Sequence, residues 1–319
     1  MSLEFLNDEK WDFAFFKKLA ANDTGSAPGH QGGMVIPKNL RPFFPTLIGQ
    51  PTSTQPSIDR TIKAELIVDG ERVDIVNTRY QIQSWGGTRQ PESRITSNLG
   101  PLRNAAHAGD FLIIQRSLED LNLYRLCLVT QTSSDFNLLG QLVGKRPWGT
   151  LYQDGPLTQK NLQIALREQK AKEEKPFILF DEELTHKETR SKRIARSIIF
   201  SATVRELYNY TCAVCKNSLK SPKGLYEISA AHIVPRSMQG SDDPRNGIAL
   251  CRTHHWSFDH GLFYVDESRK VIVPESVFGI SSNKPLFVLH GEIINEAQDK
   301  NLTADSTAFK WHVDNILIR

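Results

Sequence analysis

Short apolar runs with polar breaks between them dominate the first half of the chain. Runs typical of β-strands lie at residues 33–36, 62–68, 79–83, 110–115 and 124–130. Gly, Pro, Asn and Ser separate them, a pattern typical of a small barrel or sandwich. We expect one short helix before them, at residues 10–19. The pattern therefore predicts a mainly β first unit that ends near residue 155.

The pattern changes near residue 156. Leu162, Ala165 and Leu166 recur at the i, i+3, i+4 spacing of a helix face within residues 157–175. We interpret 156–186 as a helical linker, or as part of either neighbour. The second unit, 187–319, is expected to open with a helix, to continue through a cysteine-rich segment and to close with two further elements. These are a helix at 192–208, a strand at 287–290 and a final segment at 308–318.

Composition is that of an ordinary globular protein, with 39% hydrophobic and 24% charged residues. The length of 319 residues suggests about two domains. No apolar run is long enough to span a bilayer. Glu4, Asp8 and Glu9 near the N-terminus do not fit the layout of a signal peptide. We therefore expect neither secretion nor membrane insertion.

Charge is balanced overall, at +3, but it is uneven along the chain. Residues 187–205 hold six basic side chains against one acid, and residues 79–103 hold four arginines against Glu92 alone. Such patches indicate contact with a polyanion or simply a solvated face. Charge alone leaves both interpretations open.

Three of the four cysteines lie between residues 212 and 251. Cys212 and Cys215 form one pair of soft ligands, and Cys251 and His254 form another with the same spacing. Two such pairs can close a tetrahedral zinc site, although incidental cysteines are the alternative. A structural zinc would hold a small irregular unit together, because its binding energy adds to folding. Cys127, alone in an apolar run, is expected in the core.

Around the cysteines lie the segments AAHIVP at 230–235, DPRNGIAL at 243–250 and HHWSFD at 254–259. In order and spacing they resemble the HNH nuclease family, whose ββα-metal finger carries a His…Asn…His motif. The resemblance covers about residues 210–263. It implies that His232 is the general base, Asn246 the middle Asn, and His255 the histidine that binds the catalytic metal.

These residue types suit the hydrolysis of a phosphodiester. Histidine supplies a base near neutral pH, and a divalent cation, which we expect to be magnesium, polarises the phosphate. Asp259 follows His255 by four positions, so on a helix both could reach that cation. Many members of the family have an Asp or His ligand where this chain has Ala231. Asp259 or water would then fill the gap, or cleavage would be weak or lost.

Two further segments, KKLAANDTGSAPGHQGGMVIP and WGGTRQPESRIT, lie in the first unit. Composition allows two ordinary surface loops, or two loops that grip phosphates and read base edges. The segments resemble the N-terminal effector-binding domain of the EcoRII restriction endonuclease. That domain is a pseudobarrel related to the plant B3 domain, and it clasps the DNA major groove between two loops. The similarity covers about residues 10–155.

The EcoRII resemblance implies DNA-binding residues in both loops. These are Lys18, Asn22, Asp23, Thr24, His30, Gln31, Arg89, Glu92 and Arg94. Gly87 and Ser93 stand where basic residues are expected, so we expect the same docking mode on a different DNA sequence.

Together the two resemblances predict an α+β protein. They imply a B3-like pseudobarrel at 1–155, a linker at 156–186, and a ββα-metal domain with helical flanks and structural zinc at 187–319. The expected function is a restriction endonuclease of the prokaryotic cytoplasm that acts on double-stranded DNA beside a cognate DNA methyltransferase. One HNH site cuts one strand, so we expect a homodimer at least on DNA. The alternatives are a modification-dependent nuclease and a catalytically inactive DNA-binding protein.

Overall fold

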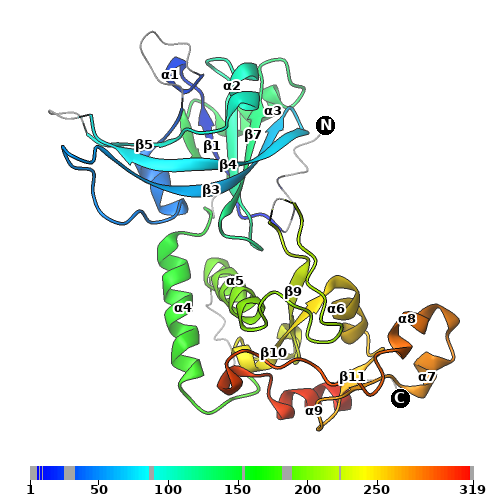
Figure 1. The fold of residues 1–319 in the computed structure, drawn as a ribbon. Coiled ribbons are helices and arrows are strands. Elements are labelled where there is room, and N and C mark those ends of the chain that lie inside the picture. The colour runs from blue at the N-terminus through cyan, green and yellow to red at the C-terminus, as the bar shows by residue number, and fades with distance from the viewer. Residues whose placement is uncertain are drawn as a thin grey trace. The chain divides into compact units, whose positions relative to one another are not determined.

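The structure is a computed structural model in which the chain splits into two compact units, residues 1–161 and 162–319 (Figure 1). It describes residues 6, 8, 10–24, 33–85, 90–152, 155–181, 189–222 and 224–316. The first unit is built around one large sheet and the second mixes short strands with helices, so the α+β prediction is confirmed. Among the helices of the described residues, none combines the length and apolar character that crossing a membrane requires.

The first unit is an eight-stranded sheet in the order β2-β5-β4-β3-β7-β6-β1-β8, and it curls into a half-barrel (Figure 1). The strands are β1 (Phe15–Lys18), β2 (Met34–Ile36), β3 (Ser57–Val68), β4 (Glu71–Gln83), β5 (Glu92–Ile95), β6 (Phe111–Arg116), β7 (Leu123–Val129) and β8 (Trp148–Thr150). Among the strands of the described residues, β3 and β7 are the one pair that runs parallel. Helices α1 (Ala21–Thr24), α2 (Gly100–Ala105), α3 (Phe136–Val143) and the 3₁₀ helix η2 (Lys38–Phe43) complete the unit.

Aromatic stacking fills the core enclosed by this sheet. The ring of Phe44 stacks on Tyr80 at 4.6 Å and on Tyr124 at 5.1 Å between centroids. The other face of the sheet has its own apolar cluster, in which Cys127 packs near Leu139 of α3. Cys127 is 2% exposed and its pKa is raised by burial, as expected of a core thiol.

The helix predicted at residues 10–19 is wrong, because Phe15–Lys18 forms strand β1. This strand pairs with β6 on one side and with β8 on the other. Phe15 and Phe16 are both buried, each in a different apolar cluster. A strand that is buried on both faces shows no alternation of polar and apolar residues, so the local pattern did not reveal it.

The second unit is built on a ββα arrangement with helices around it. Its elements are α4 (Gln159–Glu173), α5 (Arg190–Leu207), β9 (Ile228–His232), β10 (Gly247–Cys251), α6 (Arg252–Asp259), β11 (Tyr264–Val265), β12 (Val271–Ile272), α7 (Glu275–Phe278), α8 (Lys284–Phe287) and α9 (Ser306–Asn315). Strands β9 and β10 pair antiparallel, and α6 follows β10 directly. This is the order that the HNH resemblance implied.

Helices α4 and α5 confirm the helical patterns at 157–175 and 192–208. From residue 162 onward α4 lies with the second unit, where Gln169 donates a hydrogen bond to Thr203 of α5 at 2.8 Å. The strand predicted at 287–290 is wrong, because residues 284–287 form α8. Pro285 in its first turn favours a helix start.

Close packing fixes helix α5 against the hairpin. A Cβ on Gly247 would lie 2.5 Å from Val204 and 2.8 Å from the ring of Phe200. Only glycine therefore allows β10 to approach α5 this closely. The helix in turn supplies Phe200 to the site described next.

Candidate functional site: a possible metal site beside a histidine-lined pocket

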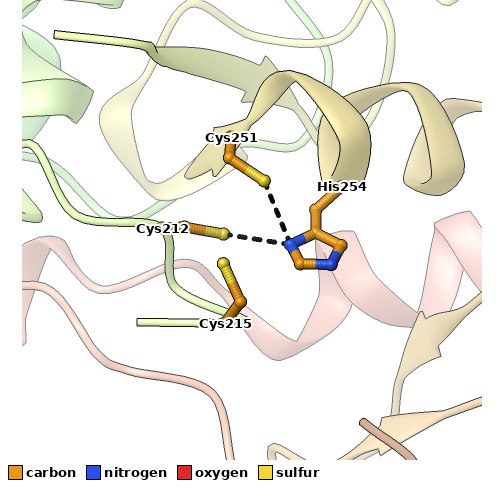
Figure 2. Close-up of side chains that lie close together, drawn as sticks. All are labelled: Cys212, Cys215, Cys251 and His254. Atoms are coloured by element: carbon orange, nitrogen blue, oxygen red, sulfur yellow. Dashed lines mark hydrogen bonds between the residues drawn. The ribbon is translucent and has the colours of Figure 1, made fainter. Parts of the chain in front are cut away.

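The four residues of the predicted zinc site meet in one place. The ligand atoms of Cys212, Cys215, Cys251 and His254 all lie within 4.8 Å of one another, and Figure 2 shows the side chains converging. Nδ1 of His254 lies 3.4 Å from Sγ of Cys212 and 3.2 Å from Sγ of Cys251. These four residues therefore form a possible metal site.

Two chain segments build this site. Cys212 and Cys215 lie in the turn after α5, which closes through the left-handed conformation of Lys216 and a hydrogen bond from its N–H to Cys212 O at 2.9 Å. Cys251 ends β10 and precedes α6, whose first turn carries His254. A metal bound here would join the turn to the start of α6.

The pKa values of two of the thiols shift in opposite directions. Hydrogen bonding with Cys251 and burial raise the pKa of Cys212 to about 11, whereas the same hydrogen bond lowers the pKa of Cys251. Three sulfurs and one imidazole form a Cys₃His set, which is a common donor set of structural zinc sites. The chemistry of the residues present fits that metal.

A second cluster lines a pocket of about 270 Å³ beside α6. It brings together residues from β9, from the loop after it, and from α6 and α9. The lining residues are Ala230, His232, Ile233, Pro235, Arg236, His255, Asp259, His312 and Ile316. The pocket therefore unites three of the HNH residues implied by the sequence, His232, His255 and Asp259.

His232 has a partner that sequence reasoning missed. Its Nε2 lies 3.1 Å from Oδ1 of Asp242, and its ring stacks on Phe200 at 3.7 Å. Because a carboxylate only accepts, Nε2 carries the hydrogen and Nδ1 is left as the proton acceptor. Asp242 itself also contacts Arg196 at 3.5 Å and Arg236 at 3.4 Å. The only signal for Asp242 in the sequence was the acidic pair at 242–243, just before Asn246.

His255 is oriented by a serine on the neighbouring strand. Nδ1 of His255 lies 2.7 Å from Oγ of Ser229, a hydroxyl that also lies 3.3 Å from Leu250 O. Nε2 of His255 lies 3.4 Å from Oδ2 of Asp259. Burial lowers the pKa of His255 and raises that of Asp259. A neutral imidazole and a carboxylate together are a donor pair for a divalent cation.

Asn246 is fully buried and acts through the loop. Its Oδ1 accepts from Val234 N at 2.9 Å, and its Nδ2 donates to the carbonyls of Val234 at 3.0 Å and Ser241 at 2.9 Å. These bonds clamp the segment that runs from His232 to Asp242. Asn246 therefore holds the two partners together without reaching the pocket.

Ala231 lies on the opposite side of β9 from the pocket. It is fully buried and pairs with Ile248 in the core, whereas Ala230 and His232 line the pocket. Successive side chains of a strand point to opposite faces. This segment of β9 therefore presents His232 to the pocket but no acidic side chain.

The predicted DNA-reading residues of the first unit fall into three groups. His30, Gln31 and Arg89 lie outside the described residues. Lys18, Asn22 and Thr24 lie in or beside α1, and Lys18 is exposed, with its Nζ 5.8 Å from the ring centre of Phe111.

Asp23 is the buried member of the first segment, at 1% exposed. Its carboxylate accepts from Lys17, from Val35 N at 2.8 Å and from Ala20 N at 2.8 Å. With both oxygens engaged inside the protein, Asp23 joins α1 to β2 and fixes the base of the loop.

Glu92 and Arg94 lie on β5 and form an ion pair at 3.0 Å. Burial lowers the pKa of Lys17, and the charges of Glu92 and Arg94 also act on it. Both residues therefore lie near the first segment. Arg94 is 3% exposed and also lines a polar recess of about 260 Å³. The other lining residues are Ser57, Arg79, Gln81, Gln83, Trp85, Thr96 and Ser97.

Two glutamines of this recess were missed by sequence reasoning. Nε2 of Gln81 donates to Oε1 of Gln83 at 3.0 Å, and Oε1 of Gln81 has no hydrogen-bond partner among the described residues. Arg79, Gln81 and Gln83 alternate along β4, and that spacing of polar residues was the available signal.

Comparison with known proteins gives two family matches. Residues 9–156 match the model described as "Restriction endonuclease EcoRII, N-terminal", and residues 212–266 match "HNH endonuclease". Among curated proteins, nothing matches the chain significantly.

Three solved structures resemble parts of the chain. A modification-dependent TagI restriction endonuclease is 21% identical over 38% of this chain and 38% of its own length, with a TM-score of 0.31. The N-terminal domain of Helicobacter pylori LlaJI.R1 is 12% identical over 44% of this chain and 98% of its own length, with a TM-score of 0.30. The protein in the Arabidopsis FUS3–DNA complex is 19% identical over 37% of this chain and 95% of its own length, with a TM-score of 0.27.

The family matches coincide with the two units of the fold and with the pocket geometry. The first covers the curled sheet, and the second covers the ββα arrangement with its metal site. The chain therefore resembles an EcoRII N-terminal domain over residues 9–156 and an HNH endonuclease domain over residues 212–266.

Proposed function

We propose that the protein is a restriction endonuclease whose first unit recognises a short sequence in double-stranded DNA and whose second unit hydrolyses the backbone. One observation carries the proposal: His232, held by Asp242, faces the same pocket as the His255–Asp259 pair. A base and a cation-binding pair in one pocket are what phosphodiester hydrolysis requires.

In this reaction His232 accepts a proton from the attacking water at Nδ1. Asp242 keeps the imidazole oriented and stabilises the imidazolium that forms. Arg236, which lines the pocket, supplies positive charge near the scissile phosphate. His255 and Asp259 would hold a divalent cation, for which we propose magnesium, and that ion would supply charge stabilisation to the phosphate.

Zinc is the metal we propose for the Cys₃His site. Its role is structural, because all four donors are protein groups and no open position is needed. By joining the turn at Cys212 to the start of α6, it would fix the helix that presents His255. Zinc and magnesium would thus have separate roles on the same helix.

DNA recognition is proposed for the loops beside α1 and β5 and for the polar recess between β3 and β5. Arg94 suits a guanine edge, and the amides of Gln81 and Gln83 suit adenine. The exposed basic residues at the start of α5, Lys192 and Arg193 among them, are proposed to follow the DNA backbone. Lys18, Asn22, Thr24, His30, Gln31 and Arg89 are proposed to contact the DNA as the EcoRII resemblance implies, whereas Asp23 holds the base of the first loop.

The test is cleavage of one plasmid prepared from methylating and from non-methylating hosts, with magnesium present. Discrete fragments from the unmethylated plasmid alone are expected, and His232→Ala should abolish them while DNA binding persists. Cutting confined to methylated plasmid would replace the proposal with a modification-dependent nuclease. Binding without any cutting by the wild type would replace it with an inactive DNA-binding protein.

Double-strand cleavage requires two HNH pockets, so we propose a homodimer on DNA. Sedimentation of the protein with its DNA should give two chains per duplex. One chain per duplex with nicked product would contradict this. The proposed setting is the cytoplasm of a prokaryote that also contains a cognate DNA methyltransferase, which protects the host sites.

A further inference from the structure

Helix α9 forms part of the wall of the nuclease pocket, although it lies some fifty residues beyond the HNH segments. His312 and Ile316 line the pocket together with His255 and Asp259. Asp305 caps the helix by accepting from Thr307 N at 2.8 Å. His312 is 2% exposed, so it faces inward.

The side chain of His312 interacts with Phe258 in two ways. Its Nε2 lies 3.0 Å from Phe258 O, and the two rings stack at 3.8 Å with 8° between their planes. A carbonyl only accepts, so Nε2 carries the hydrogen. Nδ1 has no hydrogen-bond partner in the part of the chain that the structure describes. Burial lowers the pKa of His312 to about 4, which keeps the ring neutral at ordinary pH.

Phe258 lies in the last turn of α6, directly before Asp259. Carbonyls in the last turn of a helix need partners from outside the helix. Gly261 N donates to Phe258 O at 3.1 Å, and Nε2 of His312 supplies a further hydrogen bond from a distant helix. The end of α6 is therefore fixed to α9 by a hydrogen bond and a ring stack at the same residue.

We propose that His312 is a positioning residue for the catalytic cation: through Phe258 it sets the last turn of α6, and with it the placement of Asp259 relative to Nε2 of His255. The proposal rests on the function proposed above, because it assigns these two side chains to a divalent cation. It also assigns a role to α9, which carries no motif of the HNH segments.

Two substitutions separate the hydrogen bond from the packing. His312→Phe keeps an aromatic ring for the stack but loses the donor. His312→Gln keeps an N–H donor at the corresponding distance but loses the ring. His290→Phe is the matched control, because His290 also contacts a phenylalanine and accepts a backbone hydrogen bond but does not line the pocket.

The first measurement is Mn²⁺ binding to the full-length protein without DNA, followed by the loss of the free Mn²⁺ signal in electron paramagnetic resonance. His312→Phe should weaken the affinity about tenfold, a typical effect of removing a group that orients metal ligands. His312→Gln and His290→Phe should stay close to wild type, and all variants should keep their zinc. In cleavage assays His312→Phe should lower kcat and leave the KM for DNA unchanged.

The second measurement is the tautomer of His312 by long-range ¹H–¹⁵N correlation. A neutral ring with hydrogen on Nε2 from pH 5.5 to pH 8 is expected. Wild-type affinity and kcat in His312→Phe, weaker binding in His312→Gln than in His312→Phe, or hydrogen on Nδ1 would each overturn the proposal. A wild type that binds Mn²⁺ but cuts no DNA would refute the proposed function alone. A wild type that binds no Mn²⁺ would refute the cation assignment and the role of His312 with it.

Discussion

Asp242 Oδ1 lies 3.1 Å from Nε2 of His232, and the same carboxylate contacts two arginines. The two residues are ten positions apart, at the two ends of a loop that Asn246 clamps. His232, the proposed base, is thus oriented by a buried acid outside the three positions of the His…Asn…His motif.

Asp242→Asn should retain the shape of the site but weaken its hold on the imidazolium. An amide can also donate to Nε2 and stabilise the other tautomer, so we expect cleavage to fall by about 10²-fold or more. The measurement is single-turnover cleavage with saturating protein. Glu206→Gln on the exposed side of α5 is the control, and DNA affinity should be unchanged in both. Full activity in Asp242→Asn would refute the orienting role.

Cys212→Ser should remove the bound metal and destabilise the second unit. Structural zinc contributes folding energy directly, so a loss of several kcal/mol from the free energy of unfolding is expected. Metal analysis of purified protein should give one zinc per chain in the wild type. Cys127→Ala is the matched control, because that buried thiol lies in the first unit, away from the cluster. Zinc retained in Cys212→Ser would contradict the assignment.

Arg94→Ala should cost about 1–3 kcal/mol in binding to the cognate sequence if Arg94 reads a guanine. Affinity for unrelated DNA should change little, so specificity at one base pair is relaxed. Binding isotherms on cognate and single-substitution duplexes test this. Arg72→Ala, at the far end of β4 and largely exposed, serves as the control. An equal loss on every duplex would make Arg94 a phosphate contact instead.

Stability should depend on pH through His312. Its pKa is about 4 in the folded chain and near 6.5 when unfolded, so between these values the unfolded state binds the extra proton. The contribution is complete above pH 6.5 and is lost as pH falls toward 4. Wild type should therefore lose up to about 3 kcal/mol more than His312→Gln between pH 7 and pH 4. Denaturant unfolding at several pH values checks this, and parallel curves would contradict it.

Sequence patterns predicted the parts of this protein that depend on local spacing. The ligand pairs at Cys212 and Cys251, the helices α4 and α5, and the order of the ββα segments all follow from neighbours in the chain. Residues whose role depends on distant contacts were missed. Asp242 is one of two adjacent acids in a polar loop, and His312 is a lone histidine in a helix. Only tertiary structure brings Asp242 to His232 and His312 to the pocket.

The prediction of a helix where strand β1 lies was wrong for a related reason. Its two phenylalanines are buried against different clusters, and its partners β6 and β8 lie about a hundred residues away in the sequence. No short window contains that information. The same holds for Asp23, which the loop sequence presents as a polar residue available to DNA but which the fold uses entirely for internal hydrogen bonds.

The pairing of β1 with β8 also sets the order in which the protein can be completed on the ribosome. The sheet of the first unit is finished only when residues 148–150 have emerged, and the histidines of the nuclease pocket are translated at least eighty residues later. Because domains fold as units during synthesis, N-terminal first, we expect the first unit to be assembled before the pocket of the second unit exists. Under the proposed function, a nascent chain would then acquire its nuclease pocket only after the unit proposed to recognise DNA.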